Sequence, residues 1–70
     1  MIKALNVLVN GAAERVEPGV TVAEVVGRWA RSPAGVAVAV NEAVVTRGDW
    51  DRTTLAEGDR VEILTAVQGG

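Results

Sequence analysis

One short segment of this 70-residue chain has the apolar spacing of a helix, and segments that alternate like strands lie on both sides of it. Thr21 and Glu24 form a capping-box pattern at its start, and Ser32-Pro33 is expected to end it after Arg31, because the residue before a proline avoids helical conformation. Apolar residues recur at i, i+3, i+4 and i+7 on one face, at Val22, Val25, Val26 and Trp29. This face must pack on a sheet, with Trp29 predicted as a core anchor. The expected fold class is therefore α+β.

The segments around the helix read as strands and turns. Residues 2–9 alternate, with Leu5, Val7 and Val9 on one face, and Asn10-Gly11 then supplies the two positive-φ residues of a type I′ turn. Later strands are signalled by alternating or β-branched runs and bounded by polar turn residues. The expected strands are 2–9, 12–16, 36–40, a short edge strand at 44–45, and 60–65, with an irregular stretch over 46–55.

The order of these elements predicts a β-grasp fold, in which one main helix crosses a mixed sheet of four to five strands. In that arrangement the first and last strands lie parallel at the centre of the sheet. Residues 1–65 are expected to form a single domain, because a chain of this length has room for only one hydrophobic core. Residues 66–70 are expected to form a flexible tail that ends in Gly69-Gly70.

The composition excludes most kinds of self-contained active site. The chain has no Cys and no His, which removes disulfides, thiolate nucleophiles, Cys/His metal sites and Ser-His catalysis. The net charge is -2 and the arginines are scattered, so no nucleic-acid partner is predicted. The sequence contains neither a membrane-spanning run nor a signal-peptide layout at 1–4, and a cytoplasmic location is expected by default. A large buried pocket is not expected at this size.

Two pairs of acidic residues are the remaining side-chain candidates for chemistry. Asp49 and Asp51 flank Trp50, and Glu57 and Asp59 flank a glycine. Closely spaced carboxylates can hold a metal ion or act as acid and base. Both pairs, however, lie in stretches where Asp and Gly are favoured for turn geometry. We predict turns, no metal site and no catalytic side chain.

The chain end is the strongest candidate site. Residues 66–70 follow the last predicted strand and span at most about 18 Å when extended. The absence of Cβ atoms at Gly69 and Gly70 lets such an arm enter a narrow channel in a partner, with Gln68 and Val67 behind the glycines. The reactive group is then the α-carboxylate of Gly70, which becomes an acylating group once ATP converts it to an acyl-adenylate. The alternative is an ordinary chain end whose two glycines have no function.

Several stretches of the chain resemble the thiamine-biosynthesis sulfur carriers of the ThiS family, which have the ubiquitin-like β-grasp fold. They are Val-Asn-Gly at 9–11, Thr-Val-Ala-Glu at 21–24, Gly-Val-Ala-Val-Ala-Val-Asn at 35–41, Val-Val-Thr-Arg at 44–47 with Trp50, 58–63, and Thr-Ala-Val-Gln-Gly-Gly at 65–70. The sequence departs from the family in a few extra residues before Asn6 and in Thr46, where the family often has proline.

The resemblance implies a carrier that is acted on by enzymes and holds no cofactor of its own. A ThiF-like adenylating enzyme would use MgATP to activate Gly70, and sulfur from a cysteine desulfurase persulfide would convert the carboxylate to a thiocarboxylate. Thiazole synthase (ThiG) would then take this sulfur to build the thiazole of thiamine. Partners are expected to dock on the sheet face away from the helix, and Leu8 and Leu64 are the candidates there, with ordinary exposed leucines as the alternative.

Three other functions remain open from the sequence. The small subunit of molybdopterin synthase shares the fold, the Gly-Gly end and the sulfur chemistry, although it is typically longer. A ubiquitin-like modifier that is conjugated to proteins would have the same tail. A plain interaction module would carry the two glycines by coincidence.

Overall fold

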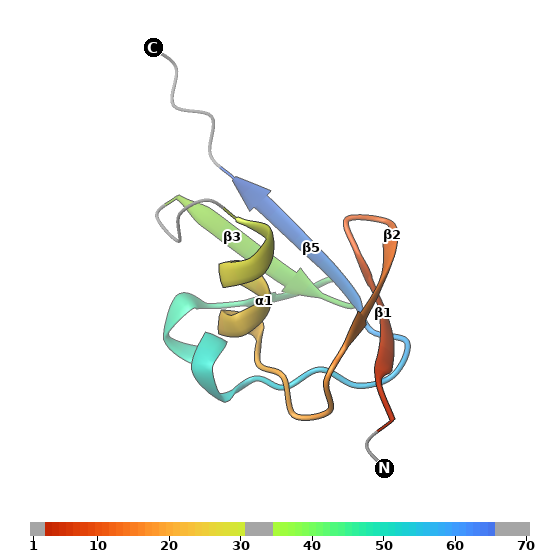
Figure 1. Cartoon of the computed structure of the whole chain (residues 1–70). Coiled ribbons are helices and arrows are strands. Elements are labelled where there is room, and N and C mark those ends of the chain that lie inside the picture. Colours follow the sequence, from red (N-terminus) through yellow and green to blue (C-terminus); the bar gives the residue numbers. More distant parts are fainter. Residues whose placement is uncertain (1–2, 31–34, 66–70) are drawn as a thin grey trace.

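The computed structural model describes residues 3–30 and 35–65, which form one five-stranded sheet crossed by one helix (Figure 1). The sheet order is β2-β1-β5-β3-β4. The central strands β1 and β5 are parallel, and each of the other pairs is antiparallel. The elements are β1 (Leu5–Val9), β2 (Ala12–Val16), α1 (Val22–Trp29), β3 (Val36–Val40), β4 (Ala43–Val45), the 3₁₀ helix η1 (Arg47–Arg52) and β5 (Arg60–Thr65). The predicted α+β class and β-grasp order are confirmed.

The turn between β1 and β2 forms as predicted. Asn10 and Gly11 have φ angles of 52° and 83°. These are the two positive values that a type I′ turn requires, and glycine adopts them without steric cost. The turn fixes the register in which Val9 pairs with Ala12 and Leu5 with Val16. Strand β1 begins at Leu5 instead of residue 2, whereas its alternation is as expected, with Val7 and Val9 buried.

The helix begins where the capping box places it. The Thr21 hydroxyl accepts a hydrogen bond from the Glu24 amide, and the Glu24 carboxylate accepts one from the Thr21 amide. The other end was predicted wrongly. The helix ends at Trp29, two residues before the predicted end at Arg31, and Ala30 is already extended. Residues 31–34, with the predicted end at Ser32-Pro33, lie outside the described residues.

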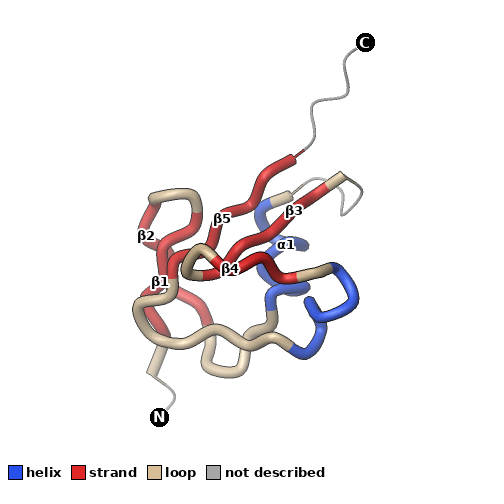
Figure 2. Tube along the Cα trace, turned by 180° about the vertical axis from the view of Figure 1, so that it is seen from behind, coloured by secondary structure: helices blue, strands red, loops and turns tan. Residues whose placement is uncertain are grey.

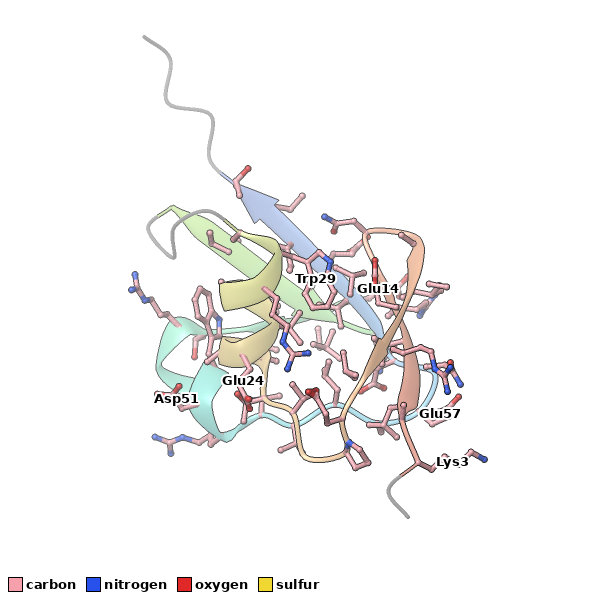
Figure 3. All side chains as sticks on the ribbon, viewed as in Figure 1. Lys3, Glu14, Glu24, Trp29, Asp51 and Glu57 are labelled. Atoms are coloured by element: carbon pink, nitrogen blue, oxygen red, sulfur yellow. The ribbon has the colours of Figure 1, made fainter. Side chains whose placement is uncertain are left out.

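The aromatic residue of the core is Trp50, and the prediction that Trp29 anchors the core is wrong. Trp29 belongs to the last turn of α1 and is 38% exposed (Figure 3). Trp50 is 5% exposed, and its indole Nε1 donates a hydrogen bond to the Val45 carbonyl at 3.0 Å. Trp50 lies in η1, a 3₁₀ helix that replaces the predicted irregular stretch and contacts α1.

The rest of the core lies between α1 and one face of the sheet. It is built from aliphatic side chains of the strands, of α1 and of the connections beside it. The buried residues are Val7, Val9, Val16, Val20, Val22, Val25, Val26, Val38, Trp50, Leu55, Val61 and Ile63. Among residues 3–30 and 35–65, all of the buried residues lie between Val7 and Ile63, so the last two residues of β5 add none.

Candidate functional site

The described part of the predicted site is the strand that leads to the chain end. Gly70, Gly69, Gln68 and Val67 lie outside the described residues, so their placement stays a prediction. Strand β5 ends at Thr65, and its alternation buries Val61 and Ile63 against α1 while Glu62 and Leu64 face outward. The tail therefore begins at the end of a strand that is half buried and central in the sheet.

Strand β5 is paired along one side up to its last residue. Its register with β3 runs from Val61 opposite Val40 to Thr65 opposite Val36. On the other side, the amide of Leu8 donates to the Asp59 carbonyl at 2.9 Å, and the amide of Asn10 donates to the Val61 carbonyl at 2.8 Å. The strand is thus paired on both sides at its start and with β3 up to its last residue, which restrains the point where the tail begins.

The outer face of the sheet, opposite α1, carries both predicted docking residues. Figure 2 views the sheet from this side. Leu8 is 38% exposed and Leu64 is 66% exposed. Leu8 pairs with Arg60, and Leu64 lies four residues further along β5, about 13 Å away at roughly 3.3 Å per residue. The two leucines thus share a face without being neighbours, because Arg60 and Glu62 lie between them.

Leu64 instead belongs to an apolar group that the sequence analysis did not assemble. Leu64 pairs with Ala37 on β3, and Ala39 on the same face of β3 pairs with Val44 on β4. Val44 is 78% exposed. We call these four residues (Ala37, Ala39, Val44 and Leu64) the outer-face patch. The alternation of residues 36–40 already placed the two alanines on one face, whereas Val44 required the β3–β4 register.

The acidic pair at 57 and 59 holds turns together, as predicted. Glu57 accepts hydrogen bonds from the backbone amide of Asn6 at 3.0 Å and from its side chain at 3.2 Å. Asp59 accepts from the Ala56 amide at 2.8 Å and from the Asn41 side chain at 2.9 Å. These carboxylates are committed to the loop that leads into β5, and their bonds fix the start of that strand.

The two residues of the other acidic pair, Asp49 and Asp51, have different surroundings. Asp49 accepts a hydrogen bond from the Thr46 hydroxyl at 3.1 Å and lies 3.7 Å from Arg52, so it stabilises η1. Asp51 lines a surface groove. Within 3–30 and 35–65, no three potential metal-ligating side chains cluster together.

Two carboxylates have lowered pKa values and make stability depend on pH. Hydrogen bonds from Asn6 lower the pKa of Glu57 below its ordinary 4.5, and the Arg28 guanidinium at 2.8 Å lowers that of Glu17. A carboxyl whose pKa is lower in the folded state stabilises the fold above its unfolded pKa, and this contribution is lost as the pH falls through the folded value. We therefore expect the urea concentration at the unfolding midpoint to decrease as the pH is lowered from about 5 to about 3.

The control for this pH dependence is a Glu57→Gln, Glu17→Gln double variant. Glutamine can still accept hydrogen bonds but does not titrate, so the midpoint of the variant should fall less over the same pH range than that of the wild type. An equal fall in both proteins would show that other groups control the acid sensitivity.

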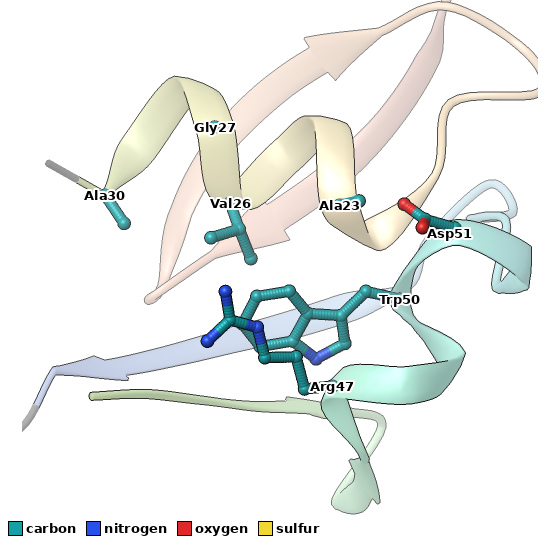
Figure 4. A pocket seen from close by; sticks show the side chains of 7 residues that line it. All are labelled: Ala23, Val26, Gly27, Ala30, Arg47, Trp50 and Asp51. Atoms are coloured by element: carbon teal, nitrogen blue, oxygen red, sulfur yellow. The ribbon is translucent and has the colours of Figure 1, made fainter. Parts of the chain in front are cut away.

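A groove of about 450 Å³ lies between α1 and η1 (Figure 4). Small residues of α1 form one wall, and Trp50 of η1 forms the other. The guanidinium of Arg47 lies over the Trp50 ring, 5.6 Å from its centroid, and Asp51 lies toward the opposite end of the groove. The groove is open to the surface beside the core, so it differs from the large buried pocket that the chain length argues against. Its lining residues are Ala23, Val26, Gly27, Ala30, Arg47, Trp50 and Asp51.

The fold and the candidate site define a ubiquitin-like β-grasp protein in which strand β5 leads toward a Gly-Gly end. Residues 5–70 match the sequence profile of the ThiS family, and the chain belongs to that family. It is a sulfur carrier of thiamine biosynthesis and acts as a carrier, with no catalytic role. Family membership favours this function over the molybdopterin synthase subunit and the protein-conjugating modifier.

Individual relatives agree with the family assignment. The sulfur carrier protein ThiS of Escherichia coli (strain K12) is 29% identical over 66 residues, which cover 94% of this chain and all of the relative. A crystal structure of the thiamine biosynthesis protein ThiS from Geobacter metallireducens matches with a TM-score of 0.77 and 33% identity, over 94% of this chain and 100% of that one. A solution structure of a thiamine biosynthesis protein from the same organism matches with a TM-score of 0.76 and 33% identity, over 94% of this chain and 88% of that one.

A longer relative combines a similar region with an enzyme. The thiazole synthase of Magnetococcus marinus is 32% identical over 66 residues, which cover 94% of this chain and 20% of that protein. The matched region is thus about a fifth of that thiazole synthase.

In the described part of this chain, no helix is long and apolar enough to cross a membrane.

Proposed function

We propose that the α-carboxylate of Gly70 is the group that carries sulfur. The observation that carries this proposal is the extent of the family match, which runs through residue 70 and so includes Gly69-Gly70. The geometry of the fold supports it, because β5 is paired with β1 at Arg60 and Val61 and with β3 through Thr65, the last described residue before the tail. Val67 and Gln68 give the tail its reach, and the two glycines keep it narrow.

The chemistry follows from the low reactivity of a carboxylate. Its oxygen attacks the α-phosphate of MgATP in a ThiF-like partner, pyrophosphate leaves, and an acyl-adenylate forms at Gly70. The terminal sulfur of a cysteine-derived persulfide then attacks the acyl carbon and displaces AMP. A thiol of the partner cleaves the resulting acyl persulfide, becoming part of a disulfide, and the thiocarboxylate remains on Gly70. The chain itself contains no cysteine, so every sulfur atom of this exchange comes from partners.

Thiazole synthase is the proposed acceptor of this sulfur. The support is the Magnetococcus thiazole synthase, in which one region resembles this whole carrier. A carrier and an enzyme joined in one chain meet at a high effective concentration, which is advantageous when the two act in succession. We propose that a thiazole synthase accepts the sulfur carried by the present chain, and that no nucleic acid takes part.

The test is a reconstitution followed by intact mass. The chain is incubated with a ThiF-type adenylating enzyme, MgATP, a cysteine desulfurase and cysteine. We expect its mass to rise by the difference between one sulfur and one oxygen atom. An unchanged mass, with an adenylating enzyme shown to be active on its own carrier, would reject Gly70 as the sulfur site. A ladder of isopeptide-linked products would instead favour the modifier function.

We also propose that partners dock on the outer-face patch, centred on Leu64. Its four residues are apolar, exposed in part and next to the end of β5, so a partner that covers them also receives the tail. An exposed apolar group of this kind is typical of an interaction surface. Leu8 belongs to the same proposal as a separate contact on the far side of Arg60 and Glu62.

A Leu64→Glu substitution is expected to weaken binding to the adenylating enzyme about tenfold or more, because a carboxylate would be placed in an apolar contact. The melting temperature should change little, since the Leu64 side chain is 66% exposed. Titration calorimetry measures the affinity. Leu8→Glu places the same carboxylate at the other proposed contact on this face, so that the losses of affinity at the two positions can be compared. Unchanged affinity in the Leu64 variant would remove this residue from the interface.

A further inference from the structure

The side chain of Asn10 makes two hydrogen bonds to the backbone of one residue of β5. Its Oδ1 accepts from the Ile63 amide at 2.8 Å, and its Nδ2 donates to the Ile63 carbonyl at 3.2 Å. Asn10 lies 53 positions earlier in the sequence, at the tip of the β1–β2 hairpin. The amide group therefore links the hairpin to the last buried residue of the strand that precedes the tail.

These two bonds continue the ladder between β1 and β5 past the end of β1. The backbone of β1 pairs with β5 only as far as the bond from the Asn10 amide to the Val61 carbonyl, because the chain turns at Asn10-Gly11. The next donor and acceptor of β5 on this side belong to Ile63, and a side-chain amide has the same donor and acceptor groups as a backbone unit. The Asn10 side chain thus adds one further pair of hydrogen bonds to this ladder.

This link between Asn10 and Ile63 affects the tail because it holds the end of β5 that precedes it. Without it, β5 beyond Val61 would be held by β3 alone among the described residues, where Ile63 faces Val38 and Thr65 faces Val36. A strand end with one partner frays more readily than one with two. Ile63 lies seven residues before Gly70, so any loosening there adds to the conformational freedom of β5 that a partner must restrict when it takes the tail.

We propose that Asn10 is a positioning residue for sulfur loading: by fastening Ile63 to the hairpin, it fixes the point and direction from which the tail leaves the sheet. The proposal rests on the carrier role of Gly70. Asn10 itself contacts no reacting atom. Its contribution is to reduce the ordering that binding requires, which lowers the KM of the adenylating enzyme for the carrier and leaves kcat unchanged once the tail is bound.

The chain contains a matched control for this proposal. Asn41 also has a positive φ, 53°, at the tip of a tight turn, and its side chain also bonds to β5. Its Oδ1 accepts from the Arg60 amide at 3.0 Å, and its Nδ2 donates to Asp59 at 2.9 Å. The two asparagines have similar conformation and chemistry. They differ in the end of β5 that they hold, since Asn41 holds the start and Asn10 the end near the tail.

The test compares Asn10→Gly with Asn41→Gly. Glycine tolerates the positive φ of each turn, so the substitutions remove the side-chain bonds and keep the turns. Pyrophosphate release by a ThiF-type enzyme with MgATP is measured over a range of carrier concentrations, at a temperature where circular dichroism shows both variants folded. For Asn10→Gly we expect KM to rise about tenfold with kcat within about twofold of the wild type. For Asn41→Gly we expect neither to change.

Amide hydrogen exchange provides the second measurement. The Ile63 amide should exchange faster in Asn10→Gly and at the wild-type rate in Asn41→Gly. Equal KM values in wild type and Asn10→Gly, or the same rise in both variants, would overturn the proposal. If Asn10→Gly does not fold, Asn10→Asp replaces it, because aspartate keeps the turn and one acceptor but places an oxygen against the Ile63 carbonyl in place of the donor, and a rise in KM is again expected. A wild-type chain that releases no pyrophosphate would reject the carrier site and this proposal together.

Discussion

Removal of Gly70 should reduce sulfur loading by more than about a hundredfold while the melting temperature stays that of the full chain. The shortened chain still ends in a glycine carboxylate, but the carboxylate is withdrawn by one residue, about 3.3–3.6 Å of extended chain. In-line attack on a phosphate requires the reacting atoms within about 3–3.5 Å, and an error of 1 Å can cost a factor of about a hundred. Intact mass after reconstitution gives the loading.

Stability should be unaffected because every buried residue of the described core lies between Val7 and Ile63. Thermal unfolding followed by circular dichroism checks this. A Gln68→Ala variant serves as the control for tail length, since it changes a side chain at constant length and should lose far less loading than the shortened chain. Full loading of the shortened chain would mean that partners tolerate a change in tail length. A large fall in melting temperature would mean that residue 70 belongs to the folded body.

The local features of this fold could be predicted from sequence because neighbouring residues determine them. Asn10-Gly11 specifies its turn through the backbone conformations that asparagine and glycine allow. Thr21 and Glu24 specify the helix start through two hydrogen bonds over three residues. The chemistry proposed for the tail also required only local sequence, since it depends on two adjacent glycines and a carboxylate.

Features that depend on distant contacts could not be predicted in the same way. The helical spacing placed Trp29 on the apolar face of α1, yet the helix ends at that residue and leaves its ring 38% exposed. Trp50 lies in a polar stretch that gives no periodic signal, and it is buried because η1 packs on α1 and Val45 accepts its indole hydrogen bond. The outer-face patch likewise depends on the register of β3 with β4 and β5, which brings Val44 and Leu64 to the same face.

The side-chain bonds of Asn10 show why a motif can have two roles. From sequence, Val9-Asn10-Gly11 indicated a turn, and the conformation of the backbone confirms it. The bonds from the Asn10 side chain to Ile63 cross 53 residues and depend on β1 and β5 being parallel neighbours. The same residue therefore serves the turn through its φ angle and the end of β5 through its amide.

The largest loss of stability is expected from Trp50→Ala. Trp50 is 5% exposed, belongs to the cluster of buried core residues, and donates to the Val45 carbonyl. Truncation of a buried aromatic side chain costs about 3–5 kcal/mol. A folded domain of this length typically has about 4–10 kcal/mol in total, at roughly 0.05–0.15 kcal/mol per residue. We expect the variant to be unfolded or to melt far below the wild type.

Trp29 and a conservative substitution supply the comparison within the same chain. Trp29→Ala should cost about 1 kcal/mol, because a substitution at a partly exposed site away from the core has a small effect. Trp50→Phe should lie between the two alanine variants, since it keeps an aromatic ring and loses the bond to Val45, and it preserves the ranking if Trp50→Ala fails to fold. Urea unfolding at constant pH measures all three. Equal losses for Trp29→Ala and Trp50→Ala would contradict the assignment of Trp50 as the aromatic residue of the core.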